Sequence, residues 1–186
     1  MLTVLKDGSM VEVATIGREG AIGVPAVLDN PRVTSAAMVQ GATDICYRMK
    51  VDAFRREIDR RGAFHELIGR YTHALFGFVA QSTVCNAVHS VEQRLARWLL
   101  MARDRMGRDD FPLTQAFVAM MLGASRPTVS VVAGTLQKAG LITYQRGHVA
   151  IMDGEQLEAA SCECNRTATN LLMTVTNGSR TPRLGS

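Results

Sequence analysis

Hydrophobic and polar residues change their spacing twice along the chain, and each change predicts a different kind of structure. From Leu2 to about Asp52, apolar residues alternate with polar ones in short runs interrupted by glycines, as in "DGSMVEVATIG" and "TSAAMVQGATDICYRMK". Alternation with a period of two and glycine punctuation are typical of strands and turns. We therefore expect about three to five short strands here, too few to form a barrel without open edges.

From Phe64 onward, one set of residues follows the spacing of a heptad repeat. Steps of four and three residues separate its members, which are Phe64, Ile68, Tyr71, Leu75, Phe78, Ser82, Cys85 and His89. A seam this narrow favours a helix over residues 63–89 that pairs with a second copy of the chain. A long helix packed on the strands of its own domain is the alternative, and Gly77 slightly weakens the coiled-coil interpretation.

One more amphipathic helix and a polar tail are predicted outside the seam. The segment "SVEQRLARWLLMARDRMG" has arginines on one side and these apolar residues at helical spacing on the other: Val91, Leu95, Trp98, Leu99 and Ala102. The last stretch, "NRTATNLLMTVTNGSRTPRLGS", becomes rich in Gly, Ser, Thr, Pro and Arg. Residues 165–186 are therefore expected to form a flexible tail.

The region after residue 111 has the spacing of a helix-turn-helix. Counted from Gln115, the close contact between the helices falls on Ala119 and the turn on Gly123, which tolerates a positive φ. The five buried positions are all apolar: Val118, Leu122, Ala124, Val129 and Val132. A generic helical hairpin would not satisfy all seven positions, so the motif is specific.

The second helix of this motif has clear ends and a polar outer face. Ser125 caps it, Pro127 lies in its first turn, and Lys138 and Gly140 mark its end. Its outer face presents small hydroxyls and one arginine near the start, a combination that contacts base edges and phosphates in a major groove. A two-helix packing element with an ordinary solvent face is the alternative.

A β-hairpin follows and completes a winged helix. Two β-rich runs, Leu141 to Tyr144 and Val149 to Ile151, flank a turn with Gly147, and side chains at its tip can reach phosphates. The expected DNA-binding residues of both elements are Gln115, Ser125, Arg126, Thr128, Ser130, Arg146 and His148. Residues 111–152 contain three Lys or Arg and no Asp or Glu, although the chain has 17 acids, which suits a face that meets phosphates.

Composition sets broader limits. The chain of 186 residues is long enough for two small domains, and 47% apolar with 20% charged residues is ordinary globular composition. A net charge of +4 permits a polyanionic partner without requiring one. No apolar run approaches the ~20 residues of a membrane span, so we expect a cytoplasmic protein with no membrane partner.

The cysteines and histidines add no clear chemistry to this picture. Four cysteines are too few and too scattered for a disulfide framework, and Cys162-Glu163-Cys164 alone is a weak metal signal, so ordinary reduced thiols are expected, with no metal and no cofactor. Cys85 on the seam is interpreted as a small buried thiol, and a redox-sensitive disulfide to a second copy stays open. No histidine has a carboxylate or nucleophile at catalytic spacing, so an enzyme is not expected.

These motifs resemble those of Crp/Fnr-type bacterial transcription regulators. The stretch from "PLTQAFVAMM" through "SRPTV" to "CEC" is similar to the family's winged helix, and the heptad segment with "SVEQRLARWLL" resembles its dimerisation helix and the following helix. The stretch "REGAIGVPAVLDNPRVTSAAMVQG" resembles the back half of its cyclic-nucleotide-binding β-roll. The resemblance implies Gly20, Arg32, Thr34 and Ser35 as candidate ligand-binding residues.

The departures from the family pattern limit what can be carried over. Gly20-Ala21-Ile22 lacks the acid that holds a ribose hydroxyl in the family's cassette, which disfavours a cyclic nucleotide. No cysteine precedes Cys46, which disfavours the iron–sulfur cofactor of other members. The β-roll is about half the family's length, so its first strands are expected to be missing. Pro127 replaces an acid of the best-known members, so their operator is not transferred.

Together these observations predict an α+β chain with four parts. These are a partial antiparallel β-roll at 1–62, a dimerisation helix at 63–89, a winged helix-turn-helix at 90–164 and a flexible tail at 165–186. The predicted function is a homodimeric, sequence-specific DNA-binding transcription regulator with a degenerate or non-cyclic-nucleotide sensor. The alternative is a small-molecule sensor module without DNA binding. Double-stranded DNA is the main partner, RNA polymerase is a further candidate, and the effector stays open.

Overall fold

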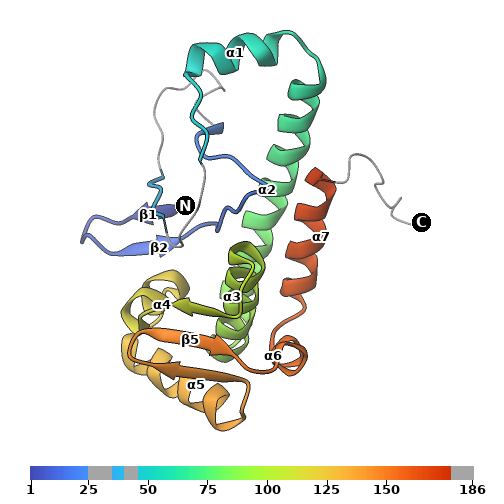
Figure 1. Ribbon diagram of the computed structural model, residues 1–186. Helices are drawn as coiled ribbons and strands as arrows, with labels where there is room; N and C mark the ends of the chain where they lie inside the picture. The colour runs from blue at the N-terminus through green and yellow to red at the C-terminus, as the bar shows by residue number, and fades with distance from the viewer. Residues whose placement is uncertain (25–34, 40–45, 177–186) are drawn as a thin grey trace.

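A computed structural model of the chain describes residues 1–24, 35–39 and 46–176. Seven helices and two small antiparallel sheets make up this part, which is the predicted α+β class (Figure 1). In chain order the elements are β1 (Leu2–Val4), β2 (Met10–Glu12), α1 (Val51–Asp59), α2 (Ala63–Val88), α3 (Val91–Met106), β3 (Asp110–Pro112), α4 (Gln115–Leu122), α5 (Arg126–Lys138), β4 (Ile142–Gln145), β5 (His148–Ile151), α6 (Gly154–Ala160) and α7 (Cys164–Thr176).

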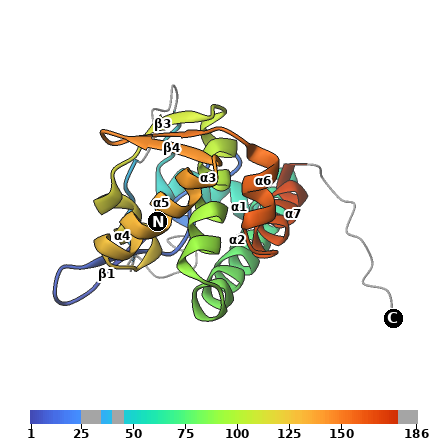
Figure 2. The ribbon, with the colours of Figure 1, turned by 90° about the horizontal axis from the view of Figure 1, so that it is seen from below.

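Helix α3 lies at the centre of the molecule. A capping box between Ser90 and Gln93 starts it, and Gly107 ends it in the left-handed conformation. Every residue from Leu95 to Ala102 is buried. Such a helix must be covered on all sides, and the view from below shows it between the α4–α5 pair and the α6–α7 pair (Figure 2). The apolar face is therefore as predicted, but Arg97 is also buried, and the side chain of Arg105 is only 10% exposed.

Helix α2 begins and ends within one residue of the predicted span, and α7 runs beside it (Figure 1). A Cβ atom on Gly77 would lie 3.1 Å from a methyl carbon of Leu171, so this glycine lets the two helices approach closely. The prediction of a flexible tail from residue 165 is wrong for residues 165–176, which belong to α7. Ala168 and Val175 are buried there at helical spacing, a pattern hidden among the polar residues of the segment. Residues 177–186 lie outside the described part.

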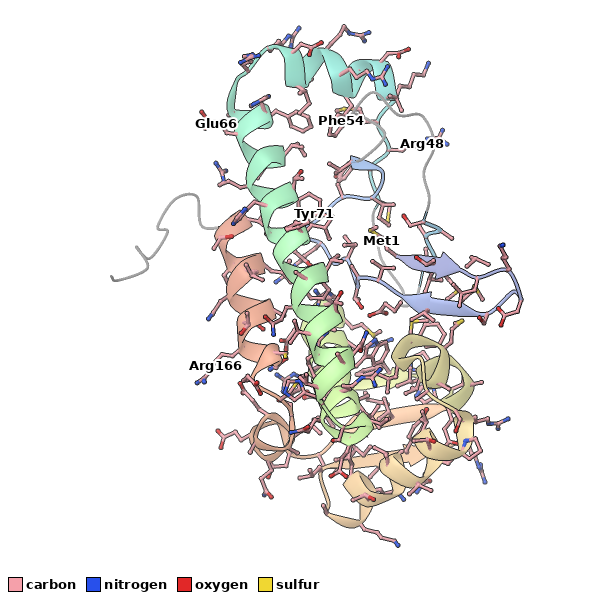
Figure 3. The ribbon with its side chains drawn as sticks, turned by 180° about the vertical axis from the view of Figure 1, so that it is seen from behind. Met1, Arg48, Phe54, Glu66, Tyr71 and Arg166 are labelled. Carbon is pink, nitrogen blue, oxygen red and sulfur yellow. The ribbon has the colours of Figure 1, made fainter. Side chains whose placement is uncertain are left out.

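The N-terminal segment docks against the middle of α2. Strands β1 and β2 pair antiparallel, and a single bridge joins Leu2 to Ala36. The hydroxyl of Tyr71 donates a 2.7 Å hydrogen bond to the carbonyl oxygen of Ala21. Figure 3 shows Tyr71 directed from α2 toward this segment. The described residues thus contain two of the predicted strands, and the other predicted runs fall largely outside the described part.

Helix α1 occupies the end of the region expected to be β-roll. The rings of Phe54 and Phe64 meet edge to face with their centroids 5.1 Å apart, which joins α1 to the start of α2. Figure 3 shows Phe54 on α1. The span 1–62 is therefore not entirely β-structure. In its last part, α1 has the apolar residues Val51, Phe54 and Ile58 at helical spacing, a period that alternation of apolar and polar residues does not reveal.

The winged-helix unit at the other end of α2 has a three-stranded sheet in the order β3-β5-β4. Among the described residues, no single helix is long and apolar enough to cross a membrane. Helices α4 and α5 meet that test by length and composition only when taken together, and they are bent by 106° at the turn between them.

Shortening Leu99 tests the central role of α3. Leu99 is fully buried, so we expect Leu99→Ala to lower the free energy of unfolding by about 2–5 kcal/mol. Val131→Ala is the matched control, since Val131 is 70% exposed and its truncation should change stability by less than about 0.5 kcal/mol. Urea denaturation followed by circular dichroism measures both, and equal effects would contradict the assignment.

Candidate nucleic-acid interface

Local sequence fixes the angle between α4 and α5. Thr114 caps α4 by accepting a hydrogen bond from the backbone of Phe117, and Ser125 caps α5 by accepting one from Thr128. Gly123 ends α4 with φ of 58°, in the left-handed region that its place in the turn requires. The resulting 106° bend is within the range of a helix-turn-helix.

The buried face of this pair follows the predicted pattern. Val118, Leu122 and Val129 are buried, and Ala124 and Val132 are partly buried and pack against the core. Ala119, at the predicted close contact between the helices, is also buried. The inward face of both helices is thereby occupied, which determines which side chains of α5 point outward.

The exposed face of α5 presents part of the predicted DNA-binding set. Arg126 and Thr128 are exposed at its start, and the Ser125 and Thr128 hydroxyls lie 2.8 Å apart. Ser130 differs, because it is half-buried and its hydroxyl donates a 2.5 Å hydrogen bond to Oε1 of Gln115. Gln115 and Ser130 thus join α4 to α5, while Arg126 and Thr128 face solvent.

The wing also has the predicted form. Strands β4 and β5 pair antiparallel and are joined by Arg146 and Gly147, whose φ values of 49° and 79° are both positive. Positive φ at both central residues is the geometry of a tight two-residue hairpin turn. Arg146 is exposed at its tip, whereas Nδ1 of His148 lies 3.4 Å from Oδ1 of Asp110. Asp110 begins β3, a third strand that sequence analysis missed because it is too short to show alternation.

The surface made by α5 and the wing is positively charged. Within the described part of the chain, Arg126, Lys138 and Arg146 form no ion pair, and all three are exposed. The N-terminal end of α5 adds the positive end of its helix dipole beside Arg126. These three cations can neutralise phosphates without first breaking an internal ion pair.

The predicted seam of α2 packs within the chain. Tyr71 holds the N-terminal segment, Phe64 contacts α1, and the ring of Phe78 lies under two guanidinium groups, 5.9 Å from that of Arg97 and 5.7 Å from that of Arg105. The remaining seam residues also have partners or pack within their own chain: Ile68, Leu75, Ser82 and Cys85. A different face of α2 is therefore the one open to a second copy.

That open face of α2 is apolar and lacks charge. Phe76 is 76% exposed, Val84 51% and Val88 67%. Ala80 and Ala87 lie exposed beside them, and we call these five residues the α2 stripe. From residue 71 to residue 88 the sequence has no Lys, Arg, Asp or Glu. An uncharged, exposed helix face of this length is typical of an interaction surface.

The candidate ligand-binding residues are only partly described. Arg32 and Thr34 lie outside the described residues, and Ser35 is half-buried. The backbone N–H of Gly20 donates to the carbonyl of Gly17 at 3.2 Å, and a Cβ atom on Gly20 would lie 2.8 Å from the ring of Tyr71. Gly20 therefore serves close packing against α2 in this structure, and its N–H group has a partner.

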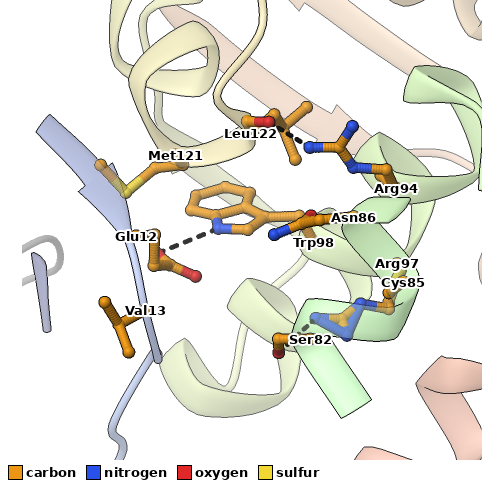
Figure 4. Close-up of a pocket in the computed structure, with 10 residues that line it drawn as sticks. All are labelled: Glu12, Val13, Ser82, Cys85, Asn86, Arg94, Arg97, Trp98, Met121 and Leu122. Carbon is orange, nitrogen blue, oxygen red and sulfur yellow. Dashed lines mark hydrogen bonds between the residues drawn. The ribbon is translucent and has the colours of Figure 1, made fainter. Parts of the chain in front are cut away.

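A small cavity lies where β2, α2, α3 and α4 meet (Figure 4). Trp98 donates to Glu12 at 3.3 Å across it, and Arg94 donates to the carbonyl of Leu122 at the end of α4. Burial lowers the pKa of Arg94, and nearby thiols oppose that change. The cavity of about 20 Å³ has room for one water molecule, so it is a packing junction and not an effector pocket.

In addition to this cavity, three cysteines and one histidine from two segments that are distant in sequence lie close together. Cys85 and His89 come from the end of α2, and Cys162 and Cys164 come from the start of α7 and the link before it. Each residue offers one atom that could bind a metal ion, a sulfur or a ring nitrogen, and these four atoms all lie within 4.8 Å of one another. We call this group the Cys3His cluster. Burial raises the pKa of the Cys85 thiol to about 12, and the guanidinium of Arg97 opposes that rise. Sequence spacing showed only the Cys162–Cys164 pair.

A family model for a Crp-like helix-turn-helix domain matches residues 93–160. The match covers α3, the helix-turn-helix, the wing and α6. Residues 93–160 therefore form a Crp-like helix-turn-helix domain. This Crp-like domain contains all seven of the predicted DNA-binding residues.

Solved structures share the fold at low identity. A Crp-family transcriptional regulator from Thermus thermophilus, TTHB099, is 20% identical over 88% of this chain and 84% of its own, with a TM-score of 0.60. FixK2 from Bradyrhizobium japonicum is 14% identical over 61% of this chain and 60% of its own, with a TM-score of 0.56.

A Crp/Fnr-family regulator from Eubacterium rectale is 22% identical over 62% of this chain, with a TM-score of 0.45. The match spans only 52% of that protein's length. A comparison with curated protein sequences finds no match.

Two glycines of the Crp-like domain provide a matched test of the turn. Gly123→Ala places a Cβ at positive φ and should lower the free energy of unfolding by about 1–2 kcal/mol. Gly134→Ala adds its Cβ in open space inside α5 and should raise stability by about 0.5–1 kcal/mol. Thermal unfolding of both variants measures the two signs, and stabilisation by Gly123→Ala would refute the turn geometry.

Proposed function

We propose that the chain acts as a homodimeric, sequence-specific DNA-binding transcription regulator. The observation that carries this proposal is the outer face of α5, where Arg126 and Thr128 are exposed at a helix start in a Crp-like domain. An arginine in this place can make a bidentate contact to guanine, and a hydroxyl can bind a phosphate or a base edge. Such a regulator acts on chromosomal DNA in the cytoplasm, with RNA polymerase as a candidate partner.

The remaining members of the predicted set have supporting roles in this proposal. Arg146 at the tip of the wing approaches the sugar–phosphate backbone next to the groove. Gln115 and Ser130 hold α4 against α5, so they orient the recognition helix. His148 lies on the wing with its Nδ1 beside the carboxylate of Asp110, and Ser125 fixes the start of α5.

The partner in the dimer is a second copy of the chain, which packs on the α2 stripe. The stripe is open, apolar and free of charge, while the opposite face of α2 is occupied by the chain's own segments. Two copies related by a twofold axis along α2 would place their α5 helices in successive major grooves, about 34 Å apart, on a near-palindromic site.

The N-terminal segment is proposed as a sensor of an effector other than a cyclic nucleotide. It contacts α2 through Tyr71 and α3 through the Trp98–Glu12 hydrogen bond, so it touches both sides of the α2–α3 junction. An effector that favours one arrangement of this segment would change the pose of the two DNA-binding domains. In this division, residues 1–62 are the sensor, 63–89 the dimerisation helix and 90–164 the DNA-binding domain.

Arg126→Ala tests the recognition helix. We expect it to weaken binding to a preferred duplex, selected from random sequences, by about 1–3 kcal/mol and to relax the preference for one base pair. Arg166→Ala is the control, since Arg166 is an exposed arginine on α7 (Figure 3). Fluorescence anisotropy at several salt concentrations measures both. Equal affinity of wild type and Arg126→Ala would refute the proposal.

The salt dependence separates the proposed function from a sensor module that does not bind DNA. A DNA-binding regulator should lose affinity steeply as salt rises, because phosphate contacts release counterions. A sensor module would show weak binding without a steep slope. The same titration therefore decides between the two functions.

Phe76→Asp tests the dimer surface. A charge in place of Phe76, the largest side chain of the α2 stripe, should convert the dimer to a monomer, because it would be buried without a partner in the interface. Met152→Asp is the matched control, since Met152 is 62% exposed on the winged-helix unit. Light scattering after gel filtration measures the mass of each variant. A dimeric Phe76→Asp protein, or dissociation by Met152→Asp, would contradict this surface.

A further inference from the structure

The Cys3His cluster has the donor set and spacing of a metal site. Its sulfur atoms come from Cys85, Cys162 and Cys164, and a ring nitrogen comes from His89. The Sγ atoms of Cys85 and Cys162 are 3.5 Å apart, and Sγ of Cys164 is 3.6 Å from Nδ1 of His89. Around tetrahedral zinc, two thiolate sulfurs lie about 3.8 Å apart and a sulfur and an imidazole nitrogen about 3.5 Å apart. The observed separations match these edges.

We propose that the Cys3His cluster binds one zinc ion in closed tetrahedral coordination. Three thiolates and one imidazole are among the usual donor sets of structural zinc sites. All four ligand positions come from this chain, so no position is left for substrate. On binding, the three thiols release their protons to solvent as the metal–sulfur bonds form.

The groups around the cluster suit this occupant. Nε2 of His89 lies 3.2 Å from a carboxylate oxygen of Glu163, an arrangement that keeps the proton on Nε2 and leaves the Nδ1 lone pair for the metal. Nε2 of Gln81 donates to Sγ of Cys164 at 3.0 Å, as a donor to a thiolate would. Histidine ligands commonly have such a carboxylate partner.

A buried cation beside the cluster supports a charged site. Arg97 is 7% exposed, its Nη2 atom donates to Ser82, and its Nη1 atom has no hydrogen-bond partner in the described part of the chain. Figure 4 shows Arg97 next to Cys85. A buried guanidinium is costly unless a negative charge lies near it. Zinc with three thiolates has a net charge of about −1, which would compensate Arg97.

The site lies at the junction between the dimerisation helix and the DNA-binding domain. His89 is the C-cap of α2 and directly precedes Ser90, which caps α3. Cys85 lies in the last turn of α2, Cys162 lies in the link from α6 to α7, and Cys164 is the first residue of α7. One ion would therefore join the end of α2 to the end of the Crp-like domain and restrict how the two move relative to each other.

Metal analysis of the untagged full chain, purified under reducing conditions, tests the proposal. We expect about one zinc per chain, and thiolate-to-metal charge-transfer bands with the spectrum of tetrahedral cobalt after exchange for Co²⁺. Cys164→Ser should lose most of the bound metal and these bands. Cys46→Ser is the control, because Cys46 is exposed and lies outside the cluster, and it should retain both.

A milder pair of variants keeps the test independent of folding. Glu163→Gln should weaken zinc binding about tenfold in a competition titration with a chromogenic chelator, because it removes the charged partner of His89. Glu158→Gln, at an exposed position on α6, should bind zinc as the wild type does. Chelation should also speed hydrogen exchange at residues 81–89 and 162–170 and leave α4 and α5 unchanged.

Four results would overturn the proposal. The first is a wild-type chain that binds no zinc under reducing conditions, and the second is a cobalt spectrum that Cys164→Ser leaves unchanged. The third is a disulfide between Cys85 and Cys162 in freshly isolated protein. The fourth is iron with inorganic sulfide in place of zinc. DNA binding by Arg126→Ala is measured separately, so failure of the zinc site and failure of the proposed function are distinguishable.

Discussion

The burial of α3 on every side is the constraint on which the rest of the structure depends. A helix with eight consecutive buried residues has no face to turn to water, so each neighbouring element must cover part of it. The helix-turn-helix covers one side, α6 and α7 another, and the β1–β2 segment reaches it through Glu12 and Trp98. The DNA-binding domain is thereby joined through one core to the N-terminal segment.

Arginines that enter this core make the α2–α3 junction sensitive to charge. Arg97 and Arg105 both approach the ring of Phe78, and Arg105 also pairs with Glu19 of the N-terminal segment at 3.5 Å. Burial lowers the pKa of Arg105, and the charge of Glu19 opposes that change. Arg97 and Arg105 therefore link the position of α2 to α3 and to the N-terminal segment. A change in the charge or position of any of these groups would alter the packing of the junction that positions α5.

This coupling connects the proposed activity with the proposed zinc site. The recognition helix can present Arg126 correctly only if the winged-helix unit holds a defined pose relative to α2. The N-terminal segment contacts this junction through Glu12, and Cys85 of the Cys3His cluster lines the same small cavity as Glu12. In the proposed dimer, a small structural change at either place would therefore alter the distance between the two α5 helices.

Sequence alone determined the local elements of the DNA-binding unit. The helix-turn-helix and its hairpin depend on caps, a left-handed glycine and a short apolar pattern, all of which act within a few residues. The α2 helix was also predicted to within one residue at its ends. The face that each residue of these helices turns inward follows mainly from the helical period, so Val118, Leu122 and Val129 could be placed in advance.

Only the tertiary structure decided which partners meet across long distances in sequence. The heptad seam could pack against a second copy or against the chain's own segments, because periodicity shows which face of a helix is apolar but not what covers that face. The structure places Tyr71 and Phe78 against the chain itself and leaves Phe76 open. Cys85 and Cys162 lie 77 positions apart, so spacing could not bring them together. Their meeting depends on α7 folding back along α2, which the close approach at Gly77 permits.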